Sequence, residues 1–164
     1  MKPMIKRKEK RVSDKKLLAC IGGKLMPLGA VADPVFASRL YGEGVAIVPE
    51  DDVIVAPCNG TITMLAYNRQ AIGIETEQGD MVLIHIGFNT AQYGDKAFEA
   101  LATEGTKVKP GMPLITINRH FLESVNADMT VCMVITNLKK IEDYRVLEGD
   151  VVSAGKTPVL ERKI

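Results

Sequence analysis

The chain of 164 residues contains only three cysteines, Cys20, Cys58 and Cys132. They are odd in number, lie far apart and form no C-x-x-C pair, so the sequence encodes neither a disulfide framework nor a zinc ribbon. A reducing compartment fits this usage. A chain of this length makes one domain, and it buries roughly two thirds of its unfolded surface without such staples.

Long hydrophobic runs are missing as well. No stretch of about 18 apolar residues occurs, which argues against a membrane-spanning helix. No charged-then-apolar leader with a small-residue cleavage site is present, which argues against secretion. Together with the cysteines, these absences predict a cytoplasmic location.

Several catalytic motifs are also absent. The chain has no G-x-S-x-G elbow, no phosphate-binding G-x-x-x-x-G-K-[ST] loop and no H-E-x-x-H pair. Its only two histidines, His85 and His120, have no obvious carboxylate partner, so a zinc hydrolase would lack its ligands. His120 lies in the polar stretch "NRHFLES", and we expect it at the surface. We predict neither a metal nor a cofactor.

Charge is unevenly distributed although the net charge is only +1. Residues 1–16 are rich in lysine and arginine, with Glu9 and Asp14 as their only acidic residues, and the remainder is acidic. We expect residues 1–16 to form a disordered basic tail that makes at most weak contact with lipid headgroups, because it has neither an aromatic residue nor an apolar face. The acidic body argues against nucleic-acid binding.

Residues 17–164 carry the pattern of one all-β domain. Short β-branched runs alternate with Gly, Pro, Asn and Asp at roughly 8 to 12 residue spacing, which is typical of an antiparallel β-sandwich or barrel. Helix signals are few. Asp33 as N-cap and Pro34 at the first helical position predict one short helix, and "KAFEALATEG", which ends on Gly105, predicts another.

Two weak internal repeats also occur. Residues 19–25 and 56–62 share A-x-x-x-G-x-[LI], and residues 104–114 and 148–159 share E-G-x-x-V-x-x-G. Such repeats arise from duplication of half the fold or from shared turn chemistry alone. The fold class that we predict is therefore a sandwich or barrel built from duplicated hairpin motifs.

The strand-like stretch "DMVLIHIGFN" contains His85 within an otherwise apolar run. A lone histidine there is more often a hydrogen-bonded core residue than a reactive one. Strand alternation places Met81, Leu83, His85 and Gly87 on one face. The Gly87 carbonyl could accept a hydrogen bond from the Nδ1–H group, which would leave the Nε2 lone pair free as a nucleophile.

The stretch "VLIHIGFNT" resembles the active-site strand of the glucose-family enzyme IIA domains of the bacterial phosphoenolpyruvate-dependent sugar phosphotransferase system. The resemblance continues in order through "DPVFASRLYGEGVAIVP", "VAPCNGTI", "EGTKVKPGMPLI", "VITN" and "GDVVSAGKTPV". It covers nearly everything from Leu17 to the C-terminus. A collinear set of motifs is stronger evidence than a single match.

The resemblance implies a phosphocarrier. His85 would accept a phosphoryl group from the histidine phosphocarrier protein and pass it to a sugar-transporting membrane subunit, which makes the chain a phosphotransferase component. The implied support of the phosphoryl site comes from Gly87 and from Asn68, Gln70 and Asn89. The implied apolar docking surface consists of Val35, Phe36, Leu40, Ile72 and Leu83.

The chain departs from the family pattern at two important positions. Gln70 replaces the family's second histidine, and it can donate a hydrogen bond but cannot share a proton. Asn89 replaces an acidic residue that could pair with a basic residue of the donor. The alternative interpretation is a regulatory reporter of the phosphorylation state, which docks to regulated target proteins and has impaired onward transfer. A zinc endopeptidase of the β-hairpin barrel type lacks its ligands.

Overall fold

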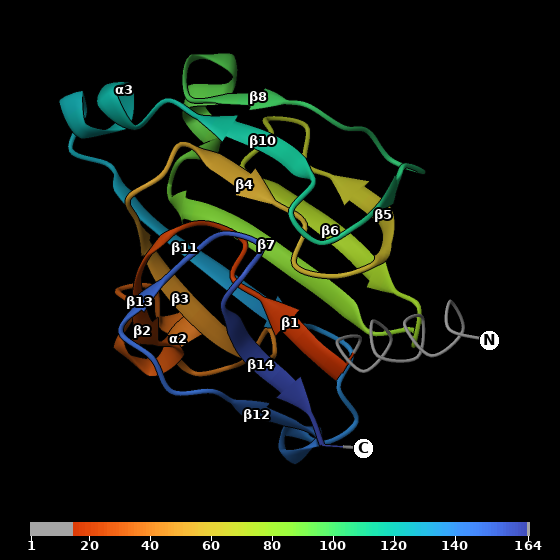
Figure 1. The fold of residues 1–164 in the computed structure, drawn as a ribbon. Helices are drawn as coiled ribbons and strands as arrows, with labels where there is room; N and C mark the ends of the chain where they lie inside the picture. The colour runs from red at the N-terminus through yellow and green to blue at the C-terminus, as the bar shows by residue number, and fades with distance from the viewer. Residues whose placement is uncertain (1–14, 164) are drawn as a thin grey trace.

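The computed structural model describes residues 15–163, and residues 1–14 of the predicted tail lie outside this range. Strand β1 begins at Lys16, one residue before the predicted start of the domain. Figure 1 shows a fold made almost entirely of strands. The short helices are η2 (Leu28–Ala30), α2 (Pro34–Ala37), η3 (Ala91–Lys96), α3 (Arg119–Ser124) and η4 (Ile141–Asp143).

The strands form three sheets, and every strand pair is antiparallel. The large sheet has the order β13-β2-β3-β11-β7-β6-β5-β9, and its strands are β2 (Gly23–Pro27), β3 (Glu43–Pro49), β5 (Gly60–Leu65), β6 (Ala71–Thr76), β7 (Met81–Phe88), β9 (Lys107–Val108), β11 (Asp128–Ile135) and β13 (Val151–Val152). The two small sheets contain β4 (Val53–Val55), β8 (Phe98–Ala100) and β10 (Pro113–Ile117), and β1 (Lys16–Leu18), β12 (Tyr144–Val146) and β14 (Pro158–Arg162). The predicted antiparallel all-β fold is confirmed, as a sandwich rather than a closed barrel.

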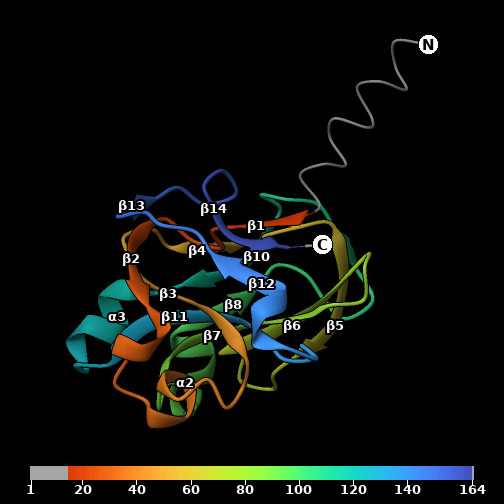
Figure 2. The ribbon, with the colours of Figure 1, turned by 90° about the horizontal axis from the view of Figure 1, so that it is seen from below.

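The main core lies between the large sheet and the two small ones. In Figure 2, β1, β4, β10 and β14 lie on one side of the large sheet and α2 lies on the other. The core side is packed with fully buried aliphatic residues, among them Ile47, Ile74, Ile84, Leu114 and Leu160. The opposite, outer side of the large sheet is covered only in part, and His85 lies there. No helix within residues 15–163 is long and apolar enough to cross a lipid bilayer.

The helix predicted for "KAFEALATEG" is wrong. Residues 98–100 form β8, which pairs with β10, so that Phe98 lies opposite Ile117. Phe98 and Ala102 are buried whereas Glu99 and Leu101 are exposed, which fits an edge strand better than a helix. Tertiary pairing has therefore overridden the helix propensity of this stretch. The helix predicted after Asp33 is confirmed as α2.

The two sequence repeats occupy equivalent places in the fold. Gly23 pairs with Val152, and Gly60 pairs with Val108. The backbone N–H groups of the two equivalent alanines donate to the carbonyls of equivalent loops, Ala19 to Thr157 and Ala56 to Met112. Shared turn chemistry alone does not produce identical long-range pairing, so the structure supports a duplication. Within each repeat, the two strands joined by the turn enter different sheets.

Gly111 and Gly155, which end the E-G-x-x-V-x-x-G motif in its two copies, lie in close contact. Gly155 has a left-handed φ of +68°, and a Cβ atom on it would lie 2.7 Å from the Cα atom of Gly111. We expect Gly155→Ala to lower the free energy of unfolding by about 3 kcal/mol, because it adds overpacking against backbone to left-handed strain. Urea denaturation measures this loss.

Gly79→Ala is the matched control. Gly79 also has a left-handed φ, of +90°, but a Cβ atom on it would meet nothing within 4 Å. Only the backbone strain applies there, so the expected loss is about 1 kcal/mol. Equal losses in the two variants would contradict the close approach of the two turns.

Candidate functional site

His85 lies near the middle of the large sheet, on its outer side. Val82, Ile84 and Ile86 of β7 are fully buried in the core, whereas His85 is only half-buried. The alternation predicted for this strand is confirmed. The interpretation of His85 as a core residue does not fit, because the imidazole lies on the face opposite the main core.

Small side chains flank the imidazole on the neighbouring strands. His85 pairs with Cys132 of β11 and with Ala71 of β6. Cys132 in turn pairs with Ala46 of β3. Directly paired residues project on the same face of a sheet. The ring therefore lies in a row of small residues, which leaves its edge accessible between neighbouring strands.

Two aromatic rings, those of Phe36 and Phe88, pack near the imidazole. The ring centroid of Phe36 lies 5.2 Å from that of His85, and the Phe88 ring stacks on His85 at 6.3 Å. Tyr41 packs on Phe36 at 4.8 Å. Phe36 belongs to an outer apolar cluster, and Phe88 packs against it. The buried members of this cluster are Leu28, Val31, Phe36, Ala46, Cys132 and Val134.

Asp33 places Phe36 beside the histidine. Its side-chain Oδ1 atom accepts hydrogen bonds from the backbone N–H groups of Val35 (2.9 Å) and Phe36 (3.2 Å). This N-cap begins α2, and Pro34 occupies the first turn. The same carboxylate acts on the imidazole through space. Asp33 is thus a site residue whose second role the sequence did not reveal.

Burial lowers the pKa of His85 below its ordinary value of 6.5, and the Gly87 carbonyl and the Asp33 carboxylate oppose this in part. The net direction is downward, so the imidazole is neutral at pH 7. A neutral imidazole carries a lone pair and needs no activating base. By contrast, burial raises the pKa of the adjacent Cys132 thiol to about 12, so this thiol is not a competing nucleophile.

The predicted hydrogen bond from Nδ1 to Gly87 is not fully formed. The Gly87 carbonyl is close enough to raise the pKa of His85. Yet Nδ1 is buried and makes no hydrogen bond of ordinary length and angle with any residue in the described range. The Gly87 carbonyl therefore acts on the ring electrostatically, without a formed hydrogen bond to Nδ1.

The backbone of Gln70 lies beside β7, next to the residue that follows His85. Its backbone carbonyl accepts a hydrogen bond from the N–H group of Ile86 at 2.7 Å, and the following residue, Ala71, pairs with His85. The side-chain Oε1 atom of Gln70 is buried and lacks a hydrogen-bond partner within residues 15–163. A buried amide without a partner is costly, which is typical of a group awaiting a ligand.

The two asparagines of the predicted support set lie in the turns that adjoin β6 and β7. Asn68 lies in the turn between β5 and β6, with its Oδ1 atom facing Gly94 of η3. Asn89 is exposed and has a left-handed φ of +59°, and its carbonyl accepts a hydrogen bond from Gln92 Nε2. Asparagine adopts this backbone conformation more readily than most residues, so Asn89 suits the bend after β7.

Four of the five predicted docking residues lie on the outer side. Val35 and Phe36 belong to α2, Leu40 follows it and is 77% exposed, and Leu83 packs against the outer apolar cluster. The assignment of Ile72 is wrong, because its side chain is fully buried in the main core. Alternation along β6 gives the outer face to its neighbours, so Ile72 cannot contact a partner.

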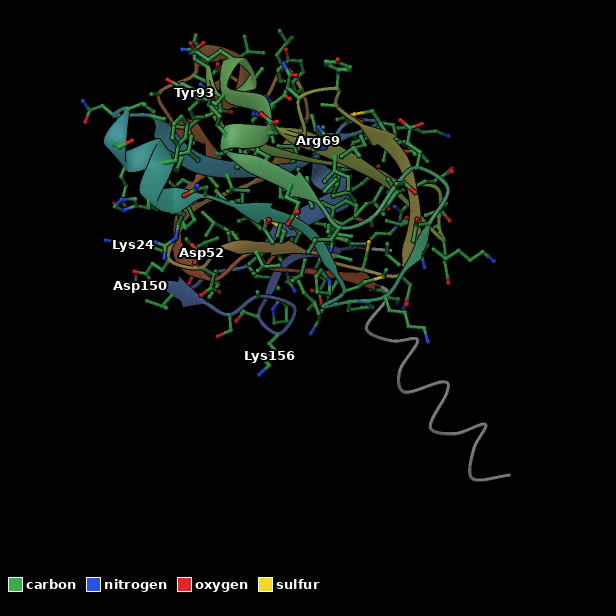
Figure 3. All side chains as sticks on the ribbon, turned by 90° about the horizontal axis from the view of Figure 1, so that it is seen from above. Lys24, Asp52, Arg69, Tyr93, Asp150 and Lys156 are labelled. Atoms are coloured by element: carbon green, nitrogen blue, oxygen red, sulfur yellow. The ribbon has the colours of Figure 1, made fainter. Side chains whose placement is uncertain are left out.

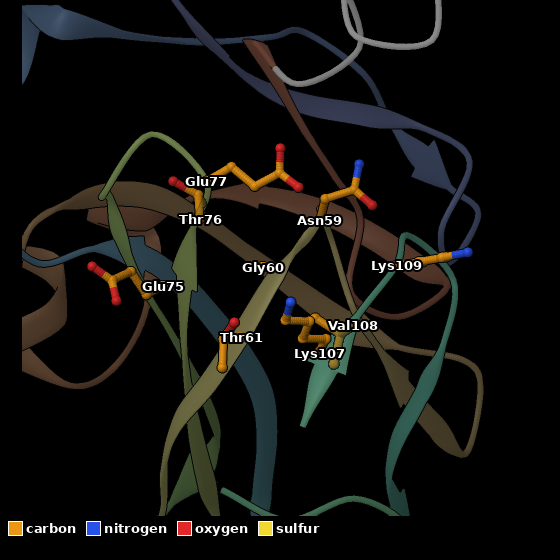
Figure 4. A pocket seen from close by; sticks show the side chains of 9 residues that line it. All are labelled: Asn59, Gly60, Thr61, Glu75, Thr76, Glu77, Lys107, Val108 and Lys109. Carbon is orange, nitrogen blue, oxygen red and sulfur yellow. The ribbon is translucent and has the colours of Figure 1, made fainter. Parts of the chain in front are cut away.

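Of the recesses at the surface, two bear on the position of a binding site. One of about 440 Å³ adjoins the histidine region, and its lining includes Asp33, Phe88, Asn89, Gln92, Tyr93 and Asp128. The other, of about 390 Å³, lies where β5, β6 and β9 meet, and Figure 4 shows Glu75 and Glu77 on one side of it and Lys107 and Lys109 on the other. Its charges balance and it contains no predicted site residue, so we assign it no function.

Charged and aromatic residues mark the two ends of the domain. In Figure 3, Arg69 of the β5–β6 turn and Tyr93 of η3 lie on one side, whereas Lys24, Asp52 and Asp150 lie on another. The second histidine, His120, is exposed on α3 as predicted. Within residues 15–163, no three His, Cys, Asp or Glu residues gather in a way that could hold a metal ion.

Comparison with known proteins agrees with this geometry. The family model for the phosphoenolpyruvate-dependent sugar phosphotransferase system, EIIA 1, matches residues 15–141. The glucose-specific EIIA components of Bacillus cereus and Bacillus anthracis are each 33% identical over 151 residues, which is 92% of this chain and 92% of theirs. The solved structure of glucose permease IIA from Mycoplasma capricolum superposes with a TM-score of 0.78 at 28% identity, covering 88% of this chain and 94% of that one. The chain therefore belongs to the EIIA 1 family of the sugar phosphotransferase system.

Proposed function

We propose that the chain is a cytoplasmic phosphocarrier that accepts a phosphoryl group on His85 from the histidine phosphocarrier protein and passes it to a sugar-transporting membrane subunit. The observation that carries this proposal is a neutral, half-buried imidazole at the centre of a partly uncovered apolar face. Relatives named as glucose-specific make glucose the first sugar to test.

The chemistry follows from the lone pair of the neutral ring. The Nε2 atom of His85 attacks the phosphorus of the donor's phosphohistidine, so that one N–P bond forms as the other breaks. The donor imidazole leaves with the electron pair of the broken bond. Positioning of the two rings is the main requirement, since no proton must be removed from the attacking atom.

The surroundings of His85 suit a protein partner better than a small molecule. Phe36, Phe88 and Tyr41 give the ring an apolar rim, and Leu40 is largely exposed beside α2. Apolar patches with aromatic residues favour protein docking. Because Asn89 replaces an acidic residue of the family pattern, this face carries one negative charge fewer than that pattern implies. Asp33 is the carboxylate that acts directly on His85.

Asp33→Asn tests this charge. Asparagine keeps the N-cap of α2, so Phe36 stays in place while the charge is lost. We expect the pKa of His85 to fall further, because a carboxylate favours the protonated ring. The variant also loses a negative charge that attracts basic residues of the donor. Phosphorylation by the donor should therefore slow about threefold to tenfold at low ionic strength and much less at high salt. NMR titration and rapid-quench kinetics measure the two effects.

Asp128→Asn is the control for that variant. Asp128 lines the same recess but acts on Cys132 rather than on His85. The His85 pKa should stay as in the wild type. Equal shifts in both variants would show that the overall charge of the recess matters, and not the position of Asp33.

A second candidate function is favoured by Gln70. An amide beside His85 in place of an imidazole weakens charge stabilisation during onward transfer. The protein would then stay phosphorylated for longer and report sugar flux by docking to regulated target proteins.

The decisive experiment follows ³²P from phosphoenolpyruvate through purified enzyme I and histidine phosphocarrier protein. We expect the label to appear in an acid-labile, alkali-stable form, with a ³¹P shift typical of Nε2 phosphohistidine. Addition of membranes carrying a glucose transporter then separates the two candidates. Rapid loss of label to the sugar supports the carrier, and retained label supports the reporter. Absence of any label would refute both.

A further inference from the structure

Strand β7 bends directly after the histidine. Opposite Gly87, the register between β7 and β11 shifts between Asp128 and Val131, so that β11 carries the extra residue of a β-bulge. Gly87 has a left-handed φ of +71°. Bulges next to a functional site redirect backbone groups and side chains. The Gly87 carbonyl, which follows this bend, is the backbone group that raises the pKa of the His85 imidazole.

Gly87 is held from both sides in this conformation. A Cβ atom on Gly87 would lie 2.5 Å from the carbonyl oxygen of Asp128 and 2.5 Å from the Cγ2 atom of Thr90. The β11 backbone therefore approaches Gly87 on one side, and the Thr90 methyl group approaches it on the other. Among residues 15–163, no other side chain approaches that position as closely.

The hydroxyl of Thr90 holds the same bend. Thr90 is 1% exposed, and its Oγ1 atom donates a hydrogen bond of 2.6 Å to the carbonyl of Ile86. Thr90 is the N-cap residue of η3, yet its side chain makes no capping bond there. The Ile86 carbonyl belongs to the same rigid peptide unit as the Gly87 N–H group. Fixing that carbonyl therefore fixes the plane from which Gly87 turns.

The preceding peptide unit is fixed as well. The N–H group of Ile86 donates to the Gln70 carbonyl at 2.7 Å. His85 and Gly87 thus flank a residue whose N–H group is held by β6 and whose carbonyl is held by Thr90. Of these two bonds, only the second depends on a side chain, so a point substitution can remove it.

We propose that Thr90 is a positioning residue for phosphoryl transfer: its hydroxyl and methyl groups hold the Gly87 carbonyl toward Nδ1 of His85, and this keeps the Nε2 lone pair directed outward. The inference rests on the proposed role of His85. Thr90 acts through Gly87 and does not itself touch the reacting atoms.

The test compares Thr90→Val with Thr90→Ser. Valine keeps the shape but loses the hydroxyl, so the Ile86 carbonyl loses its partner and the Gly87 carbonyl is free to turn. We expect a lower His85 pKa, a larger fraction of the ring protonated on Nε2 in ¹⁵N NMR, and phosphorylation about 10- to 100-fold slower. The acid limb of the pH–rate profile should move to lower pH. Serine restores the hydroxyl and should return most of the rate.

Thr76→Val is the matched control for a purely structural loss. Thr76 is also buried, and its Oγ1 atom accepts a hydrogen bond from the Asp80 N–H group in the turn between β6 and β7. This variant should lose stability but keep the wild-type tautomer, His85 pKa and rate. If Thr90→Val behaves in the same way, the positioning role is overturned. The NMR comparison decides this even if wild-type His85 accepts no phosphate, and that result would refute the proposed function separately.

Discussion

Replacing His85 with alanine is expected to abolish phosphoryl incorporation, with a loss of at least about 10³-fold relative to the wild type. The nearest alternative nucleophile is the Cys132 thiol, which is fully buried and has a pKa raised to about 12 by that burial. The thiolate is therefore essentially absent at pH 7. Labelling with ³²P from phosphoenolpyruvate measures the loss directly.

His120→Ala is the matched control for that variant. His120 is exposed on α3, and the turn containing it lies beside Asp52, away from the outer apolar cluster. The variant should incorporate label at the wild-type rate. Circular dichroism should show both variants folded, since His85 is half-buried and lies outside the main core. Label that persists in His85→Ala would refute the assignment of the phosphorylated residue.

Replacing Gln70 with histidine is expected to accelerate onward transfer by about 10²-fold. The Gln70 backbone carbonyl accepts the hydrogen bond of the Ile86 N–H group, so the substitution keeps this bond and changes only the side chain of residue 70. A protonated imidazole would stabilise the negative equatorial oxygens of the phosphoryl group in the transition state, whereas the amide donates without a charge. Rapid-quench transfer from the phosphorylated chain to a glucose-specific membrane subunit measures the change.

Gln92→His controls for adding an imidazole to the same region. Gln92 belongs to η3, and its side chain donates to the Asn89 carbonyl on the rim. This variant should leave onward transfer unchanged. A wild-type protein that already transfers as fast as Gln70→His is an ordinary carrier, and the reporter interpretation then fails.

Arg69 is the residue that could compensate for the missing histidine. Compensation requires a turn at this position, because neighbouring strand residues point to opposite faces. Arg69 does lie in the turn between β5 and β6, where its N–H group donates to the Ala66 carbonyl at 2.8 Å. Arg69→Ala should therefore slow any residual onward transfer of the wild type, and it should matter less once residue 70 is a histidine.

Local patterns predicted much of this architecture. Two-residue alternation identified β7 and the face of His85, and the Asp33–Pro34 pair located α2, because both signals act over a few residues. The same reasoning failed for residues 98–100, where pairing with β10 decided the structure. The docking role that the resemblance implied for Ile72 is also wrong, because its side chain faces the main core. Apolar character alone cannot distinguish a docking face from a core face.

The contacts that shape the site could not be read from local patterns. Cys132 lies beside His85 only because of the register between β7 and β11, which brings together residues 47 positions apart. The through-space effect of Asp33 likewise depends on α2 folding over the sheet. The duplication was visible as two short repeats, but equivalent strand pairing was needed to separate common descent from common turn chemistry.

The duplication also supplies a second position equivalent to that of His85. Lys24 pairs with Val48 and Thr61 pairs with Glu75, so β3 and β6 correspond. The same offset matches Gly44 to Ala71. The partner of Ala71 is His85, and that of Gly44 is Val134.

The two equivalent positions differ in burial. Val134 is fully buried beneath Leu28, Val31 and Phe36, whereas His85 remains half-open. A symmetric pair of half-chains would have to present two identical reactive centres or none. Fusion into one chain permits specialisation: one copy of the motif carries the half-buried imidazole, and the other anchors the segment that covers part of the outer face.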